Sequence, residues 1–169
     1  MDRSEYEMRV GAARGGDKDA FCELYETVYR KMYRVAFYAL KNPQDAEDAV
    51  SEAVYDAFRK IHALRDASRF EGWIFAILAS KIKRTMSGYY RRTLELSEEI
   101  AAEPLFDDGA LDVKSQLALL PPEERLIVVL SAVCGYQSEE IGAIVGRPAG
   151  TVRSKLSRSL SKLREKLDA

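Results

Sequence analysis

The sequence predicts an all-α protein made of two small helical domains that an acidic linker joins. Apolar residues recur at three- and four-residue spacing along most of the chain, and no stretch shows the period-two alternation of a half-buried strand. The length of 169 residues allows two small domains. Between Thr93 and Asp112, Pro104 and Gly109 break the periodicity, and the segment carries seven acidic residues and no lysine or arginine.

The N-terminal half begins with two helices whose start signals can be read directly. Asp17, after a glycine pair, is placed to cap the first helix, which runs to about Leu40 with a continuous apolar stripe. Asn42 and Pro43 supply the cap and the first-turn proline of the second helix. The outer face of this second helix is acidic.

A third helix is expected to begin near Ser68 and to end near Arg92, becoming basic toward its end. Its aromatic residues Phe70 and Trp73 could serve as stacking platforms, but their helical spacing favours a place in the core.

The C-terminal half has the outline of a helix-turn-helix. Pro121-Pro122 opens a helix that closes at Gly135. A short helix over 138–145, a tight turn at 146–148 and a longer helix over 150–167 follow.

The last of these helices has two different sides. At 100° per residue, one side gathers Val152, Leu156, Leu160, Leu163 and Leu167. The other side carries Ser154, Ser157, Arg158 and Ser161. Serine and arginine bond base edges, and short side chains let a helix approach DNA closely. Thr151 near the helix start is placed to bond a phosphate. A solvated amphipathic helix would explain the charge alone, but the turn and the preceding short helix favour DNA.

Composition excludes several classes of protein. A net charge of -1 excludes a uniformly basic nucleic-acid coat. The longest apolar run, Leu126–Cys134, is about half of the roughly 20 residues that a bilayer span needs, and the N-terminus lacks a signal-peptide core, so we expect a cytoplasmic protein without membrane insertion. Cys22 and Cys134 are expected to be packing thiols. With His62 as the only histidine, no catalytic residue, metal site or cofactor is predicted, and no enzyme.

Five blocks of the chain resemble successive blocks of the bacterial sigma-70 family, in its small extracytoplasmic-function (ECF) group. The blocks are GDKDAFCELYETVYRKMYRVA, NPQDAEDAVSEAVYDAFRKI, FEGWIFAI, LPPEERLIVVL and GYQSEEIGAIVGRPAGTVRSKLSRSLSKLRE. Order and spacing match over most of the chain, which is far more specific than a lone helix-turn-helix. The resemblance implies a region 2-like domain over 1–92, a linker over 93–112 and a region 4-like domain over 113–169.

The resemblance also implies how such a protein acts. It docks on core RNA polymerase, recognises the minus-10 and minus-35 promoter elements with its two domains, and helps to melt DNA between them without covalent chemistry. Polymerase docking falls on the second predicted helix, at Asp48, Ser51 and Glu52. An acidic helix face suits a basic coiled-coil partner. The family usually has glutamine at position 51, so one polymerase hydrogen bond is expected to be shorter or missing here.

For the promoter, the resemblance assigns two sets of residues. The minus-10 set lies on the third predicted helix, at Ser80, Lys81, Lys83, Arg84, Arg91 and Arg92. Strand opening needs basic side chains that bind the DNA backbone. It also needs aromatic rings on which an extruded base can stack, because unstacking the base costs free energy. The family commonly has Arg, Arg, Asn and Asp where this chain has Ala76, Ala79, Ser80 and Arg84. The minus-35 set is Arg147, Thr151, Arg153, Ser154, Ser157 and Arg158.

Members of the family are commonly held inactive by an anti-sigma factor, which is therefore an expected third partner. The main competing hypothesis is a one-component helix-turn-helix regulator whose N-terminal half senses a signal or forms a dimer. A more distant one is a helical interaction protein that has lost promoter recognition.

Overall fold

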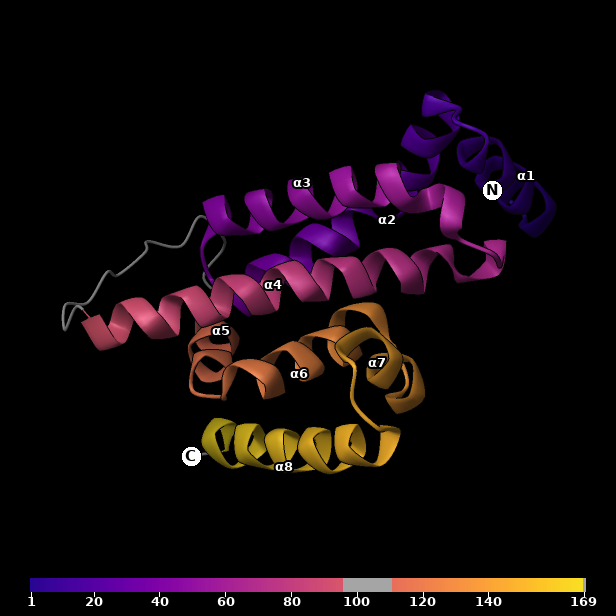
Figure 1. Cartoon of the computed structure of the whole chain (residues 1–169). Helices are drawn as coiled ribbons and strands as arrows, with labels where there is room; N and C mark the ends of the chain where they lie inside the picture. The colour runs from indigo at the N-terminus through magenta and orange to yellow at the C-terminus, as the bar shows by residue number, and fades with distance from the viewer. Residues whose placement is uncertain (96–110, 169) are drawn as a thin grey trace.

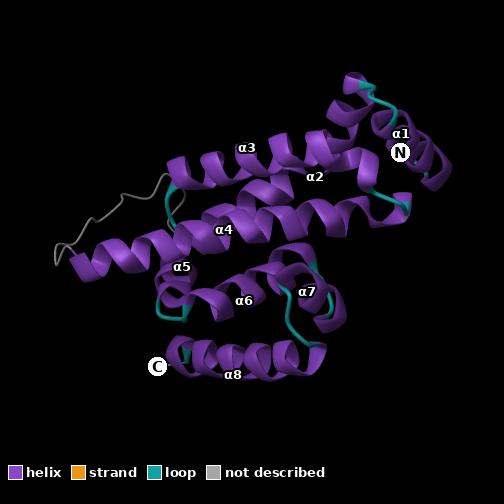
Figure 2. Cartoon of the chain, in the orientation of Figure 1, coloured by secondary structure: helices purple, strands orange, loops and turns teal. Residues whose placement is uncertain are grey.

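The structure is a computed structural model that describes residues 1–95 and 111–168, and all regular elements in these residues are helical (Figure 2). The predicted all-α class is therefore confirmed. The α-helices are α1 (Arg3–Arg14), α2 (Lys18–Leu40), α3 (Pro43–Lys60), α4 (Phe70–Glu95), α5 (Leu111–Ala118), α6 (Pro122–Cys134), α7 (Ser138–Val145) and α8 (Ala149–Leu167). Two short 3-10 helices, Ile61–Ala63 and Ala67–Arg69, connect α3 to α4.

The caps read from the sequence are the caps of the structure. The Asp17 carboxylate accepts a hydrogen bond from the Ala20 amide at 3.1 Å, which satisfies one of the unpaired donors at the start of α2. Asn42 does the same at the start of α3 for the Asp45 amide, at 3.1 Å, with Pro43 in the first turn. These side chains fix where each helix begins.

The N-terminal residues and the bounds of α4 differ from the sequence predictions. The N-terminal residues form α1, which was not predicted; Asp2 caps it, and Val10 and Ala13 pack into the core. The third predicted helix begins at Phe70 instead of near Ser68, because the Asp66 side chain first closes a 3-10 turn on the Ser68 amide. Helix α4 then continues to Glu95. Of the predicted linker, residues 96–110 lie outside the described residues.

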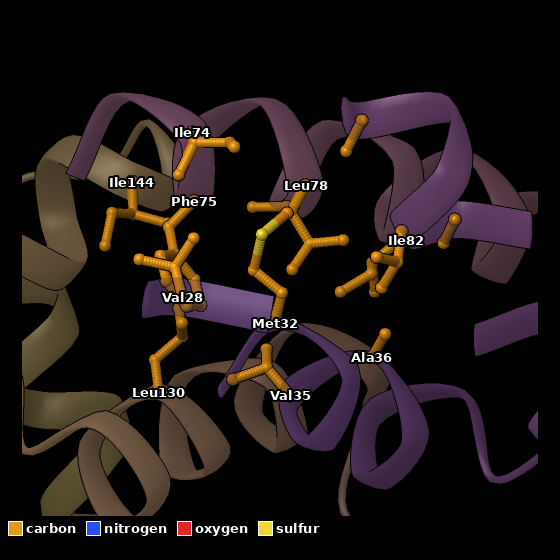
Figure 3. Close-up of a cluster of buried hydrophobic side chains, with 14 of the residues drawn as sticks. Val28, Met32, Val35, Ala36, Ile74, Phe75, Leu78, Ile82, Leu130 and Ile144 are labelled. Carbon is orange, nitrogen blue, oxygen red and sulfur yellow. The ribbon is translucent and has the colours of Figure 1, made fainter. Parts of the chain in front are cut away.

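Helix α2 lies at the centre of the molecule and packs against α1, α3, α4 and α6. Figure 1 shows α3 and α4 running side by side, α6 and α7 lying beneath α4, and α8 lying beneath α6. One hydrophobic core continues through both halves of the chain. Figure 3 shows its centre, where side chains of α2, α4, α6 and α7 meet, among them Val28, Met32, Phe75, Leu78, Leu130 and Ile144.

Polar contacts also join the two halves. The Arg125 guanidinium of α6 donates to the Ala39 carbonyl at the end of α2, at 2.9 Å. The Tyr136 hydroxyl donates to Glu71 Oε1 of α4 at 2.9 Å, and its ring lies edge-on to that of Phe75, with centroids 5.6 Å apart. The two halves of the chain are thus closed on each other.

Candidate nucleic-acid and protein interfaces

Helices α7 and α8 form a helix-turn-helix with a close approach at the turn. Gly146 ends α7 in the left-handed conformation, with φ of 73°, and its amide donates to the Gly142 carbonyl at 2.9 Å. A Cβ on Gly142 would lie 2.5 Å from the Arg147 carbonyl oxygen, closer than real Cβ contacts come. Glycine at position 142 therefore lets the turn pass close to α7. Helix α8 starts at Ala149, one residue earlier than predicted.

The polar side of α8 is open to solvent, as the sequence predicts. Ser154, Ser157 and Arg158 are exposed together, and Thr151 is half-buried at the start of the helix. The Ser154 hydroxyl donates to the Gly150 carbonyl at 3.1 Å, and Arg158 Nε donates to the Ser154 carbonyl at 3.3 Å. Such local bonds can be exchanged for base or phosphate contacts without loss of packing.

The apolar side of α8 differs from the prediction. Leu160 and Leu167 are 48% and 51% exposed, whereas Ser159 is fully buried and donates to Glu124 Oε2 at 3.1 Å. The side that faces α6 follows Val152, Leu156, Ser159 and Leu163. Serine is a polar residue, so the spacing of apolar residues could not predict that Ser159 is buried. The predicted apolar side therefore included Leu160 and Leu167, which are exposed.

Two cations of the helix-turn-helix converge on Glu123, in the first turn of α6. Arg147 Nε lies 2.6 Å from one carboxylate oxygen, and Lys155 Nζ lies 2.7 Å from the other. Hydrogen bonds lower the pKa of Glu123, and the one from Lys155 has a larger effect than the one from Arg147. Arg153 is paired in the same way with Glu139 of α7, at 2.8 Å. Arg147 and Arg153 were predicted to bind DNA, whereas no signal in the sequence marks Glu123 and Glu139 as their partners.

The proposed docking residues lie on the solvent side of α3. Ala46, Ala49, Val50, Ala53 and Ala57 are buried, and this places Asp48, Ser51 and Glu52 on the exposed ridge. Asp48 accepts a hydrogen bond from Gln44 Nε2 of the same helix at 3.3 Å. Glu52 forms an ion pair with Arg84 of α4.

The minus-10 candidates on α4 fall into two groups. Ser80, Arg91 and Arg92 are exposed. The other three contact protein groups: Lys81 Nζ lies 2.6 Å from Asp56 of α3, Arg84 pairs with Glu52, and Lys83 Nζ donates to the Val145 carbonyl at the end of α7. Burial lowers the pKa of Lys83. The helix dipole favours a cation at the C-terminus of α7. Lys83, a predicted DNA contact, therefore also joins the two halves of the chain.

The acidic and basic candidates meet in one groove between α3 and α4. Its lining includes Asp48 and Glu52 on one side and Lys81, Arg84 and Arg92 on the other. Two departures from the family pattern have a structural counterpart. Ala79 is only 2% exposed, so position 79 faces the core in this chain. Arg84 finds its partner Glu52 across the groove.

The predicted core position of Phe70 and Trp73 is confirmed, whereas the prediction for the two cysteines is wrong for one of them. Phe70 is fully buried and Trp73 packs beside it, with ring centroids 6.2 Å apart, as a core role requires. Cys134 is half-buried, but Cys22 is exposed on α2, so the prediction that both are packing thiols is wrong for Cys22. Helix α2 turns this position toward solvent at the edge of the stripe.

The described residues contain neither a membrane-spanning helix nor a cluster of metal ligands. No helix among them is long and apolar enough to cross a membrane. In the same part of the chain, no group of three or more His, Cys, Asp or Glu side chains is placed to hold a metal ion.

Two family models match the chain, one in each half. The model for Sigma-70 region 2 matches residues 24–93, which contain α3 and most of α4. The model for Sigma-70, region 4 matches residues 110–163, which contain the helix-turn-helix. Together the two matches cover most of the chain.

Individual relatives agree with the family models. The chain is 25% identical over 177 residues to the ECF RNA polymerase sigma factor SigW of Bacillus subtilis, over 94% of this chain and 95% of that protein. It is 33% identical over 148 residues to the ECF RNA polymerase sigma factor SigE of Mycolicibacterium smegmatis, over 81% of this chain and 57% of that longer protein.

A solved structure extends this similarity to three dimensions. The sigma factor RpoE of Bartonella quintana, in complex with the anti-sigma factor NepR, is similar to this chain with a TM-score of 0.77 at 25% identity. The similarity covers 90% of this chain and 99% of that one. The chain therefore belongs to the sigma-70 family of RNA polymerase initiation factors, in its extracytoplasmic-function group.

Proposed function

We propose that this chain directs core RNA polymerase to promoters by docking through α3, reading the minus-10 element with α4 and reading the minus-35 element with α8. The observation that carries the proposal is the arrangement of α8: it is the second helix of a helix-turn-helix, and its solvent side presents Arg153, Ser154, Ser157 and Arg158. Short polar and guanidinium side chains on such a helix suit the major groove.

Docking on polymerase is assigned to Asp48, Ser51 and Glu52. Support comes from their place on an exposed ridge whose opposite side is packed into the core. A rigid helix with two carboxylates attracts a basic partner helix and fixes its orientation. Replacing Asp48 and Glu52 by arginine should therefore weaken polymerase binding without unfolding the protein, since both side chains point away from the core.

Promoter contacts are assigned to the two sets of basic and hydroxyl residues. On α4 these are Ser80, Lys81, Lys83, Arg84, Arg91 and Arg92; on the helix-turn-helix, Arg147 and Thr151 bind phosphates beside the base-reading residues. In this proposal, residues 1–92 form a region 2-like domain and residues 113–169 a region 4-like domain, and residues 93–112 are the linker between them. The protein acts without covalent chemistry, as a binding factor and not as an enzyme, and works in the cytoplasm.

An anti-sigma factor is the expected regulator. The solved structure of RpoE includes the anti-sigma factor NepR, and the similarity of the two chains supports an equivalent partner here. Such a partner would act by covering the docking or promoter-reading residues.

The test is run-off transcription on a genomic promoter library with purified core polymerase, with and without this protein, at a fixed salt concentration. Start sites that depend on the protein are expected, and their alignment would give both promoter elements. Duplex binding without any polymerase-dependent start site would instead support the one-component regulator. The absence of both activities would contradict both assignments.

A further inference from the structure

A groove of about 550 Å³ lies where α4 meets the C-terminal half of the chain. Its charged and hydroxyl lining comes from both halves: Lys83, Ser87 and Arg91 of α4, Glu123 of α6, and Arg147 of the turn between α7 and α8. It shares no lining residue with the charged groove between α3 and α4. Three cations against one carboxylate give its described lining an excess of positive charge.

The carboxylate of this groove is already neutralised from within the protein. One Glu123 oxygen lies 2.6 Å from Arg147 Nε, and the other lies 2.7 Å from Lys155 Nζ. Arg91 is exposed, and no described residue forms an ion pair or a hydrogen bond with it. The charges of Lys83 and Arg91 are therefore not balanced by Glu123.

Lys83 and Arg147 keep hydrogen-bond donors for a ligand. Lys83 Nζ donates to the Val145 carbonyl, which uses one of the three N–H groups of an ammonium. Arg147 contacts Glu123 through Nε, one of the five N–H groups of a guanidinium. Burial lowers the pKa of Lys83 and Arg147 lowers it further, whereas Glu123 raises it. An anion between Lys83 and Arg147 would relieve the repulsion of these two cations.

The donors on α4 form a row. Lys83, Ser87 and Arg91 follow one another at four-residue spacing, so they lie on the same side of the helix. At a rise of about 1.5 Å per residue, Lys83 and Arg91 are about 12 Å apart along the helix axis. A single phosphate group does not reach both ends of such a row, whereas a chain of phosphates does. Ammonium and guanidinium groups form strong, charge-assisted hydrogen bonds to phosphate oxygens.

We propose that this groove binds an oligophosphate anion, which bridges α4 and the turn of the helix-turn-helix. Lys83, Ser87 and Arg91 bind it from one half of the chain, and Arg147 binds it from the other. Because both halves contribute, the ligand binds the closed arrangement and stabilises it. Three of these residues are also proposed promoter contacts, so a bound oligophosphate withdraws them from DNA. That consequence rests on the proposed function, whereas binding of the anion does not.

The groove also has an apolar part, made by Met86 and Pro122. Met86 is partly buried against the hydrophobic core, so its position is fixed. A nucleotide base can pack on these two side chains while its phosphates face the cations. A nucleoside triphosphate and inorganic polyphosphate share the chemistry that the cations recognise, and the two sources differ only in their use of this apolar part.

The experiment is isothermal titration calorimetry of the full chain in magnesium-free buffer at low salt. The probes are inorganic tripolyphosphate, adenosine triphosphate and orthophosphate. We expect one tripolyphosphate per chain and an affinity for orthophosphate that is about tenfold weaker or less, since one phosphate forms fewer charge-assisted bonds. Tighter binding of adenosine triphosphate would support a nucleotide as the ligand, and equal binding would support inorganic polyphosphate. No binding of either would overturn the proposal.

Two neighbouring arginines provide the matched control. Arg91 and Arg92 are both exposed and carry the same charge, but Arg91 lines this groove and Arg92 lines the groove between α3 and α4. Arg91→Gln should weaken tripolyphosphate binding by about tenfold, the loss of one charge-assisted hydrogen bond. Arg92→Gln should weaken it by less than about twofold, because exposed charges outside the site are screened. Equal losses would show unspecific attraction by the basic end of α4 and overturn the proposal.

Arg147→Gln tests the contribution of the other half. It should also weaken tripolyphosphate binding by about tenfold. Arg153→Gln removes an exposed arginine of α8 that is paired with Glu139, and the affinity should hardly change. Melting temperatures of the unliganded variants control for folding. Unchanged affinity of the Arg147 variant would confine the site to α4 and overturn the bridging of the two halves.

Two further measurements separate this inference from its alternatives. Hexaglutamate that binds as tightly as tripolyphosphate would assign the groove to an acidic polypeptide and overturn the oligophosphate. Run-off start sites that depend on the protein, in the absence of oligophosphate binding, would leave the proposed function standing and overturn this site. Binding that depends on Arg91 and Arg147 in a protein without such start sites would support the site alone.

Discussion

At the scale of single residues, Arg158 is the most direct probe of base reading by α8. Its guanidinium is exposed on the same side as Ser154 and Ser157, and its Nε donates to the Ser154 carbonyl of the same helix. An arginine that pairs with a guanine edge contributes to one base position, whereas a phosphate contact contributes equally on every sequence.

Arg158→Ala should therefore cost about 1 to 3 kcal/mol in binding at one minus-35 position and much less at sequences that already lack the preferred base. The measurement is competition binding of holoenzyme to promoters that carry each single substitution in the minus-35 element. A uniform loss on all sequences would reassign Arg158 to a phosphate. Ser161→Ala, on the same side of α8, serves as the control for local helix effects.

Arg84 and Glu52 form the second informative residue pair, because each belongs to a different proposed interface. Both side chains are more than half exposed, so the pair contributes little to stability, within about 0.2 to 1 kcal/mol. If Arg84 binds DNA as proposed, it exchanges the Glu52 carboxylate for a phosphate. The acid thus competes with DNA for the cation.

Glu52→Gln should tighten binding of the isolated protein to a single-stranded minus-10 oligonucleotide by about two- to fivefold at low salt, the range that such a pair allows. The same substitution in an Arg84→Gln background should have no effect. Fluorescence anisotropy at two salt concentrations measures both, and the gain should shrink at the higher salt because exposed charges are screened. A gain that persists without Arg84 would mean that Glu52 acts on DNA by itself.

At the scale of elements, the first turn of α6 holds the helix-turn-helix in place. Glu123 forms ion pairs with Arg147 and Lys155, and Glu124 accepts a hydrogen bond from the hydroxyl of the buried Ser159. Because the folded state lowers the pKa of Glu123 below its ordinary 4.5, the stabilisation is complete above that value and is lost as pH falls through the lower folded pKa.

The melting temperature should therefore fall as the pH drops below about 4.5, and Glu123→Gln should remove part of that dependence. At pH 7 the variant should melt below the parent protein, and the difference should narrow toward pH 3, where Glu123 becomes increasingly protonated in the unfolded and then the folded state. Circular dichroism melts across this pH range provide the measurement. A constant difference at all pH values would show that Glu123 acts through packing instead of charge.

The same scale shows what the sequence could predict. Starts with a strong cap, such as Asp17 and Asn42, and the glycine at position 146 were predicted because a local chemical signal marks each of them. Helix α1 was missed because its charged residues hide the two that are buried, Val10 and Ala13. The buried stripe of α8 was misplaced at Ser159, whose burial depends on a carboxylate from another helix. Local signals are readable, whereas a partner distant in sequence is not.

At the scale of the whole molecule, closure of the two halves is the feature that the sequence did not reveal. It depends on pairs far apart in the chain, such as Lys83 with the Val145 carbonyl and Tyr136 with Glu71. For this reason the candidate site residues were assigned one by one, but their mutual contacts were not. The two halves share one core, and a predicted minus-10 lysine, the half-buried Lys83, bridges them.

The closed arrangement cannot be the one that reads a promoter. The centres of the minus-10 and minus-35 elements are about 25 base pairs apart, which is roughly 85 Å of duplex. Helix α8 packs on α6 and α7, which in turn pack on α4, so α8 lies about two interhelical distances, roughly 20 Å, from α4. If α4 and α8 read the two elements as proposed, the two helices separate when both elements are bound, and the separation breaks the contact of Lys83 with the Val145 carbonyl.

Tyr136→Ala should favour this separation, because it removes a hydrogen bond to a carboxylate and a ring contact with Phe75 that together contribute about 2 kcal/mol to closure. The measurement is energy transfer between dyes on Glu26→Cys of α2 and Leu167→Cys at the end of α8, both exposed positions, in a Cys22→Ser and Cys134→Ser background. The parent protein should show one short distance that lengthens by tens of ångströms with polymerase and promoter. The Tyr136→Ala variant should populate the long distance even without polymerase and promoter. Tyr136→Phe, which keeps the ring but loses the hydroxyl, should populate it to an extent between those of the parent protein and Tyr136→Ala. A parent distance that stays short in the promoter complex would contradict the opening.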